Sequence, residues 1–546
     1  MRLCILGCPP AGLSYSSVAD TQGNVPVKRR RDVIARRVYA ADGAAGWSVT
    51  AAGATAPWIA LCPPQTQPPA QGWKIHLTAA LPSAIAVFER AWPLLHREQV
   101  ACKIIASLDQ LWRLNTGGYG ATQVGKFLTI YPQDDTQAVR LAAALDLATA
   151  GLRAPAVPSD RPLRPGSLVS YRYGSFTDRY QYRASGEVVP IYTAPDGTCV
   201  PDERRLVYQA PPAIPDPFST AGISGPIADP ARLIAGRYLP ISPLYQSPRG
   251  CIHLALDLQE AATCVLKQAG RNALLDAAGC DARDDLRHEA AVLATLAGDP
   301  RFPTPGPLVA DQEDLFLPLT ELIGVTSADY VAGRPVSNAQ IVTWGGDLAA
   351  LLSTVHAHGW IYGDIKSSNV IVAPDGTLRL LDFGLATAIH TPARRPGAGT
   401  PGYMSPQQRA GARPTVADDV YGLGAWLYFV ATGAEPSQAP RPNRLWTRRP
   451  TVLNPALSPA IAAVIARCSD PRPRRRPRSP ALVTAALVVA GSAAVPSSAP
   501  VLGTEDGGRS SRSGGSSTRF GRSHWVSRLR RLPPEYPTRP GAARRH

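Results

Sequence analysis

The pattern of apolar residues divides the chain into two ordered regions, and the first of them ends near Tyr208. Three of its segments alternate or are apolar in the way that strands are: WKIHLTA, ACKIIASL and GKFLTIYP. Two others have apolar residues at helical spacing: SAIAVFERAWPLLHREQ and TQAVRLAAALDLATAGL. These patterns predict a compact region of mixed helices and strands.

The second ordered region contains a long helical pattern followed by a predicted hairpin. Apolar residues at i, i+3, i+4 and i+7 place one face of the helix at Leu348, Leu351, Leu352 and Val355. The hairpin consists of Val370–Val372 and Leu378–Leu381, which flank a Pro-Asp-Gly turn. This region therefore also combines helices with strands, so the predicted fold class is an α+β multidomain protein.

Composition suggests where the domains begin and end. Residues 1–55 are rich in Ala and Gly and form a poorly specified lead-in, while 211–230 are rich in Pro and are typical of a linker. These boundaries predict one domain over 56–210 and a second over 231–490. Residues 491–546 are rich in Arg, Ser, Gly and Pro, which favours a disordered basic tail.

The net charge of +16 belongs to the C-terminal part of the chain. Residues 441–480 contribute +9 and 491–546 contribute +7, so residues 1–440 are formally neutral. The arginines are not interleaved with aromatic residues, so we expect no nucleic-acid module. Nine scattered cysteines without metal-ligand spacing indicate a reducing cytoplasm. The apolar segment at 481–495 has only ~15 residues, fewer than the ~20 of a membrane span, so no transmembrane segment is predicted.

Lysine is scarce, because only six of the 57 basic residues are lysines. A position that keeps lysine can require a compact ammonium group, or an amine whose pKa can be lowered to make a base. Chance is the plain alternative for any single lysine. Five of the six nevertheless fall inside short motifs: Lys74, Lys103, Lys126, Lys267 and Lys366.

The predicted hairpin places a polar set next to its two strands. Asp364, Lys366 and Asn369 lie at one end, and Asp382 begins the sequence Asp-Phe-Gly at the other. Phosphoryl transfer requires a carboxylate to deprotonate a hydroxyl, oxygen ligands for Mg²⁺ and a cation on the phosphate. The set therefore indicates a phosphotransferase.

These residues resemble the eukaryotic-type Ser/Thr protein kinases, together with GTPGYMSP (399–406) and DDVYGLG (418–424). The resemblance implies a bilobal fold that uses Mg²⁺ with ATP or another nucleoside triphosphate. It implies that Asp364 is the catalytic base, Lys366 contacts phosphate, and Asn369 and Asp382 bind the metal. Upstream, Lys267 in VLK would be the ATP lysine, with Glu289 as its ion-pair partner.

The kinase motifs depart from the family pattern in three places. Tyr362-Gly363 replaces the usual His-Arg, and Ser405-Pro406-Gln407 replaces Ala-Pro-Glu. The phosphate loop, PLYQSPRGCIHLALD, retains one glycine, Gly250, where the family has three. An inactive pseudokinase is the alternative, although the metal and phosphate groups all remain.

The first region has a second basic constellation. Lys74 and His76 alternate on one predicted strand, so their side chains share a face. Lys103, Lys126 and Arg172 add three cations. Such a face suits a dianion, and elimination of phosphate needs a base for the α-proton, cations on the phosphate and an acid for the leaving oxygen. A simple surface pair is the alternative for Lys74 and His76.

This face resembles the phosphothreonine lyases in its Lys-x-His strand and downstream lysines. The order of the two regions, with phrases such as QGWKIHLTA and VPSDRPLRPGSLVSYRYG, resembles the class III lanthionine synthetases, which are lyase–kinase–cyclase enzymes. The resemblance implies a phospholyase-like domain in which Lys103 is the general base and His76 the general acid. Lys74, Lys126 and Arg172 would bind phosphate, and Lys74 could exchange roles with Lys103.

The resemblance implies a function and its partners. The chain would phosphorylate Ser and Thr of a leader-bearing precursor peptide and eliminate the phosphate to give dehydroamino acids. After Ala490 the 56 remaining residues predict no cyclase, so either a separate cyclase acts or the reading frame is altered. Two alternatives remain, namely a kinase with a non-catalytic binding domain and an inactive scaffold.

Overall fold

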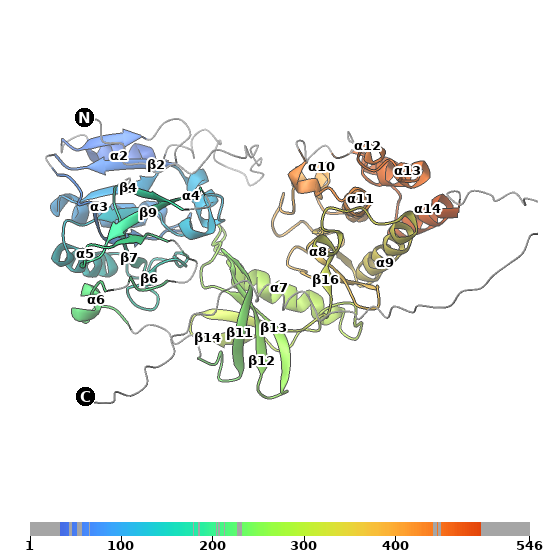
Figure 1. The fold of residues 1–546 in the computed structure, drawn as a ribbon, viewed down its shortest axis with the longest axis horizontal. Helices are drawn as coiled ribbons and strands as arrows, with labels where there is room; N and C mark the ends of the chain where they lie inside the picture. Colours follow the sequence, from blue (N-terminus) through green and yellow to red (C-terminus); the bar gives the residue numbers. More distant parts are fainter. Residues whose placement is uncertain are drawn as a thin grey trace, which may run out of the picture. The chain divides into compact units, whose positions relative to one another are not determined.

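The computed structural model describes residues 33–42, 46–51, 57–64, 66–177, 179–183, 186–203, 205, 208–211, 213–225, 232–439, 445 and 449–492. Most of the predicted lead-in and almost all of the predicted tail lie outside these residues. The chain forms two compact units (Figure 1), residues 1–290 with 305–320, and residues 291–304 with 321–546. The domain boundaries taken from composition stay predictions.

A seven-stranded antiparallel sheet dominates the first part of the first unit. In spatial order its strands are β1 (Ser48–Ala51), β2 (Trp58–Cys62), β4 (Ala101–Ile105), β5 (Leu128–Tyr131), β3 (Gln71–Leu77), β7 (Val169–Ser175) and β6 (Arg161–Pro162). The helices of this part are α2 (Val33–Asp42), α3 (Ala84–Arg97), α4 (Leu108–Asn115), η1 (Ala121–Gln123), α5 (Asp135–Ala148) and α6 (Pro217–Thr220).

The two faces of strand β3 have different characters. Trp73, Ile75 and Leu77 enter a hydrophobic core that also contains Phe88 of α3 and Leu141 of α5. Because side chains alternate along a strand, the opposite face of β3 presents its polar residues. All the strand and helix segments predicted in this region are present, and the alternation of WKIHLTA marks this division of faces.

Two further sheets complete the first unit. The smaller one contains β10 (Cys199–Pro201), β9 (Val188–Thr193) and β8 (Tyr180–Tyr182). The five-stranded sheet contains β11 (Tyr238–Ser247), β12 (Gly250–Asp257), β13 (Ala262–Ala269), β15 (Asp314–Thr320) and β14 (Val309–Asp311), and α7 (Ala282–Thr295) follows β13 in the chain.

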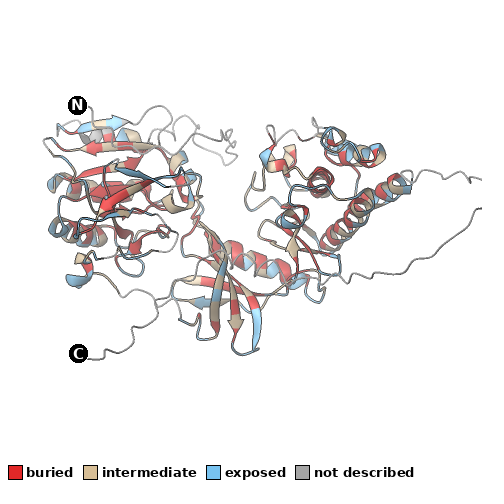
Figure 2. Ribbon diagram, viewed as in Figure 1, coloured by how far each residue is buried: buried red, intermediate tan, exposed pale blue. Residues whose placement is uncertain are grey.

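The second unit is mainly helical. Its helices are α8 (Ser327–Val331), α9 (Asn338–Ala357), α10 (Pro406–Arg409), α11 (Val416–Thr432), η2 (Pro436–Gln438), α12 (Pro450–Leu453), α13 (Pro459–Cys468), η4 (Pro473–Arg475) and α14 (Pro480–Ser492). Its short strands are β16 (Val325–Thr326), β17 (Trp360–Ile361), β18 (Val370–Val372), β19 (Leu378–Leu380) and β20 (Thr387–Ala388). Every residue of α11 from Asp418 onward is buried, so this helix forms the centre of the unit (Figure 2).

The predicted helix and hairpin are both confirmed. The four residues predicted for the apolar face of α9 are at most 1% exposed. Strands β18 and β19 pair antiparallel, with Val370 opposite Leu380 and Val372 opposite Leu378. Among the residues that the structure describes, none of the helices has the length and apolar character of a membrane span.

Candidate active sites

The ATP lysine predicted from the sequence is paired with its predicted partner. Lys267 lies on β13 between β12 and β15, and its Nζ is 2.6 Å and 2.8 Å from the two carboxylate oxygens of Glu289 on α7. The Glu289 side chain is 5% exposed. The glutamate is buried and the lysine partly buried, and the two contacts hold the ammonium group against both carboxylate oxygens.

Gly250 begins β12, directly after the turn that joins it to β11. Its φ is +153°, and a Cβ atom added there would collide with the backbone carbonyl oxygen of Gln268 on β13. Neither the backbone conformation nor the space admits a side chain. This close approach explains why a loop with few glycines retains this one.

Asp364, Lys366 and Asn369 meet next to the β18–β19 hairpin. Lys366 Nζ is 2.7 Å from Asp364 Oδ2, while Asn369 Nδ2 donates to the backbone oxygen of Asp364 at 2.9 Å. Thr400 Oγ1 donates to the other carboxylate oxygen of Asp364 at 2.9 Å. The aspartate is therefore held by three side chains, two of which were predicted.

The predicted metal ligands have suitable chemistry for Mg²⁺. Asp382 follows β19 and has a left-handed backbone with φ of +58°. The backbone amide of Leu381 donates to the Asn369 carbonyl oxygen at 2.8 Å, which ties the two ends of the hairpin together. Because Asn369 uses its amide nitrogen on Asp364, its side-chain oxygen is the donor left for a hard cation.

Tyr362 and Gly363 fit the position where the family has His-Arg. The backbone amides of both residues donate to the buried carboxylate of Asp419, each at 2.8 Å. The Tyr362 hydroxyl donates to the Leu381 carbonyl at 2.5 Å, and its ring packs edge-on against Phe383 at 5.2 Å. Burial raises the pKa of this hydroxyl well above its usual value, so it acts as a neutral donor.

Gln407 replaces the glutamate of the family's buried ion pair, and the structure shows what it contacts. Gln407 Oε1 accepts from Arg476 Nη2 at 2.6 Å, and its Nε2 donates to the Pro471 carbonyl at 2.9 Å. The Arg476 side chain is 0% exposed and lies 3.8 Å from Asp418. Arg476 thus keeps the carboxylate of Asp418 nearby, and the amide oxygen of Gln407 takes the place of the family's glutamate.

The basic residues of the first region line the polar face of the seven-stranded sheet. Lys74 on β3 is directly opposite Arg172 on β7, and His76 is opposite Thr129 on β5. Lys103 on β4 is opposite the same Thr129. Directly opposite residues share a face, so Lys103 lies in one row with His76, two strands or about 10 Å away.

Two buried aspartates organise the cations around His76. His76 Nδ1 makes a short hydrogen bond with Asp160, and Lys126 Nζ is 3.1 Å from the other oxygen of that carboxylate. Asp202 binds Arg172 and lies 3.7 Å from Lys74 Nζ. These six residues, each at most 7% exposed, are Lys74, His76, Lys126, Asp160, Arg172 and Asp202.

The environment keeps His76 neutral and Asp160 ionised. Burial is the main reason why the pKa of His76 falls to about 3, and Lys126 lowers it further. Burial alone would raise the pKa of Asp160, but Lys126 and His76 hold it well below its usual value. His76 therefore donates its Nδ1 proton to Asp160, and Nε2 is left as an acceptor.

Lys103 is the predicted residue that stands apart from this cluster. Its Nζ lies over the ring of Trp58 on β2, 5.1 Å from the ring centre, and its side chain is only partly buried. Sequence reasoning missed Asp160 and Asp202. Asp160 lies within VPSDRPL, and a carboxylate among buried cations is the signal that could have pointed to it.

Two family models match the chain. The RamC N-terminal domain matches residues 35–224, and the protein kinase domain matches residues 274–486. The "Probable SapB synthase" of Streptomyces coelicolor is 33% identical over 382 residues, which are 67% of this chain and 40% of that protein. The chain thus spans less than half the length of this relative.

Other relatives are named as serine/threonine-protein kinases and match a smaller share of the chain. "Serine/threonine-protein kinase AfsK" of Streptomyces coelicolor is 39% identical over 109 residues, 19% of this chain and 14% of that protein. "Serine/threonine-protein kinase F" of Synechocystis is 30% identical over 276 residues, 47% of this chain and 55% of that protein. A protein kinase domain generally uses ATP and Mg²⁺. With both domains matched in the predicted order, the chain belongs to the proteins that join a RamC N-terminal domain to a protein kinase domain.

Proposed function

We propose that the chain is a bifunctional dehydratase, which phosphorylates Ser or Thr of a leader-bearing precursor peptide and then eliminates the phosphate. The observation that carries this proposal is the buried cluster of Lys74, His76, Lys126 and Arg172 around two aspartates. A kinase alone does not need this cluster. We expect the reaction to occur in the cytoplasm.

In the kinase step, Asp364 would orient the substrate hydroxyl and accept its proton, while Lys366 contacts the transferring phosphoryl group. Asn369 and Asp382 would hold Mg²⁺, which neutralises charge on the phosphates. Lys267, fixed by Glu289, would contact the phosphates of ATP. The contacts of Lys366 and Thr400 with Asp364 support this assignment because they keep the carboxylate in one orientation.

In the lyase step, formal charges favour a phosphate dianion. Three cations, Lys74, Lys126 and Arg172, face two carboxylates while His76 is neutral, so these six residues have a formal charge of +1 when Lys103 is the neutral amine that a base requires. A bound dianion favours protonated His76, since a nearby negative charge raises the pKa of a histidine. The bound substrate would thereby convert His76 into an acid.

Elimination then follows with its protons accounted for. Lys103, as its neutral amine, removes the α-proton and becomes an ammonium group. The electrons of that C–H bond form the Cα=Cβ double bond, and the Cβ–O bond breaks. The phosphate leaves with its bridging oxygen and accepts a proton from His76. Lys74 remains the alternative base, although its position opposite Arg172 favours a phosphate contact.

Mass spectrometry of a candidate Ser/Thr-rich precursor incubated with Mg-ATP tests the proposal. A gain of about 80 Da per site indicates phosphorylation only, and a loss of about 18 Da indicates that both steps occur. Asp364→Ala should give unmodified peptide yet still dehydrate a peptide supplied in phosphorylated form. Lys103→Arg should accumulate phosphopeptide, because a guanidinium cannot act as a base near neutral pH.

The same experiment separates the alternatives. Wild-type protein that phosphorylates the precursor but leaves the authentic phosphopeptide untouched would refute the lyase step and support a kinase with a binding domain. Wild-type protein that changes neither peptide while its circular dichroism shows a native fold would support an inactive scaffold.

A further inference from the structure

Three connecting segments of the five-stranded sheet contact the N-terminal domain within the first compact unit. Pro248, in the β11–β12 turn, packs against Gly117, where an added Cβ atom would lie 3.1 Å from the proline ring. Glu313, in the β14–β15 turn, lies 3.4 Å from the Cβ position of Gly166. The third segment joins β13 to α7 and contacts Arg153.

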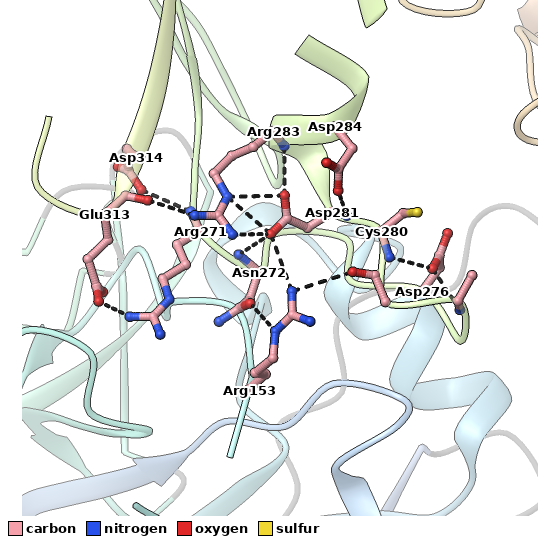
Figure 3. A network of polar contacts seen from close by, with 12 residues as sticks. Arg153, Arg271, Asn272, Asp276, Cys280, Asp281, Arg283, Asp284, Glu313 and Asp314 are labelled. Atoms are coloured by element: carbon pink, nitrogen blue, oxygen red, sulfur yellow. Dashed lines mark hydrogen bonds and ion pairs between the residues drawn. The ribbon is translucent and has the colours of Figure 1, made fainter. Parts of the chain in front are cut away.

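Arg153, which follows α5 in the N-terminal domain, binds this third segment at three points (Figure 3). Its Nε donates to Asn272 Oδ1 at 3.0 Å, and its Nη2 donates to the carbonyl oxygen of Gly279 at 3.4 Å. The same Nη2 lies 3.8 Å from Asp281 Oδ2. One guanidinium therefore holds both ends of the connection between β13 and α7.

Asp281 links the segment that Arg153 contacts to helix α7. It directly precedes α7, and its side chain is 1% exposed. Its two carboxylate oxygens accept from the backbone amides of Arg283, at 2.9 Å, and Asn272, at 3.0 Å. Its own backbone amide donates to Asp284 at 2.9 Å. Asp281 thus ties the first turn of α7 to the segment that Arg153 binds.

The segment connects the two elements that supply the Lys267–Glu289 pair. Lys267 lies on β13 just before it, and Glu289 lies about two turns into α7. The helix is also tied to the β11–β12 turn, because Arg249 Nη1 is 3.0 Å from Asp285. Fixing the start of α7 therefore fixes both the glutamate and the β11–β12 turn that precedes Gly250.

We propose that Arg153 of the N-terminal domain is a positioning residue for the kinase, because it holds α7 where Glu289 can pair with Lys267. The inference rests on the kinase step of the proposed function. The N-terminal domain would then support the nucleotide site of the kinase, in addition to containing the buried cluster around His76. Kinase competence then depends on contacts outside the matched kinase domain.

Isothermal titration calorimetry of the full chain with Mg-ATP, together with hydrogen exchange of α7, tests this role. Arg153→Ala removes the guanidinium, and Asn272→Gly removes its main acceptor while tolerating the left-handed φ of +56° at that position. Each change should weaken Mg-ATP binding by about 3- to 30-fold. The double variant should bind Mg-ATP no more weakly than Arg153→Ala alone, since that change already removes the contact with Asn272.

Arg140→Ala is the matched control. Arg140 is similarly exposed, at 55% against 48% for Arg153, but its ion pair with Glu98 lies entirely within the N-terminal domain. It should change neither Mg-ATP affinity nor exchange of α7, whereas Arg153→Ala should speed exchange in the first turns of the helix. Unchanged affinity and exchange in Arg153→Ala, or additive effects in the double variant, would overturn the proposal. Wild-type protein that binds no Mg-ATP would refute the kinase function itself.

Discussion

Asp160→Asn tests the buried cluster most directly, because it removes one charge and keeps the shape of the side chain. In the wild-type protein Asp160 accepts from His76 Nδ1, from Lys126 at 3.1 Å and from Ser159 Oγ at 2.9 Å. An asparagine keeps one oxygen but turns a donor toward one of these partners. The variant therefore weakens the attraction for Lys126 and removes the acceptor that fixes the tautomer of His76.

The magnitude follows from the burial of the pair. Removing one partner of a buried ion pair typically costs about 3 to 5 kcal/mol, because the remaining charge loses its compensation. Loss of a positioned acid should slow elimination of phosphate by about 10²- to 10⁴-fold. Phosphorylation of the precursor by folded protein should continue, because the contacts of Asp160 named above involve none of the kinase residues Asp364, Lys267 and Glu289.

The assay uses a phosphopeptide supplied directly, with release of inorganic phosphate as the readout and chemical denaturation as the measure of stability. Asp146→Asn is the control, since Asp146 pairs with the half-exposed Arg164 and should contribute about 1 kcal/mol or less. Normal phosphate release by a folded Asp160→Asn protein would show that His76 needs no fixed tautomer and would remove it as the acid.

Three further outcomes are expected. The free energy of unfolding should fall as the pH drops from 6.5 toward 3, by at most about 5 kcal/mol, because the unfolded chain protonates His76 before the folded one does; denaturation of His76→Gln should show a smaller decrease. Asp382→Ala should abolish phosphorylation in a peptide mass assay while leaving the circular dichroism unchanged. Gln407→Glu should lower the melting temperature, since its second oxygen would face the Pro471 carbonyl that Gln407 now binds; an unchanged value would mean that Arg476 compensates.

Local patterns predicted the elements and most of the site because both depend on short stretches of sequence. The alternation at 73–77 indicated which face of β3 is polar, and the Asp-Phe-Gly motif indicated the end of the hairpin. Asp160 and Asp202 escaped because His76 and the cations that they bind are at least 30 positions away in the chain. Only the folded sheet brings these carboxylates to the cations, and no periodicity reports such contacts.

The departures from the kinase pattern also show what a local sequence pattern cannot predict. From the sequence, Gln407 indicates a missing carboxylate, and the pattern alone predicts a loss. In the structure Arg476 still has polar partners. Its guanidinium donates a hydrogen bond to the amide oxygen of Gln407, and Asp418 supplies the negative charge. The sequence shows only which chemical group a substitution removes. The effect on the protein depends on the neighbouring side chains.

The scarcity of lysine gains a physical meaning from where the lysines lie. Four of the five motif lysines contact a carboxylate: Lys74, Lys126, Lys267 and Lys366. Lys103 Nζ lies over the ring of Trp58. A carboxylate orients an ammonium group and favours its charged form, which suits a contact with phosphate. The positions of the other four lysines therefore support their assignments as cations, whereas the role of Lys103 as the base stays what the family resemblance implies, and Lys103→Arg tests it.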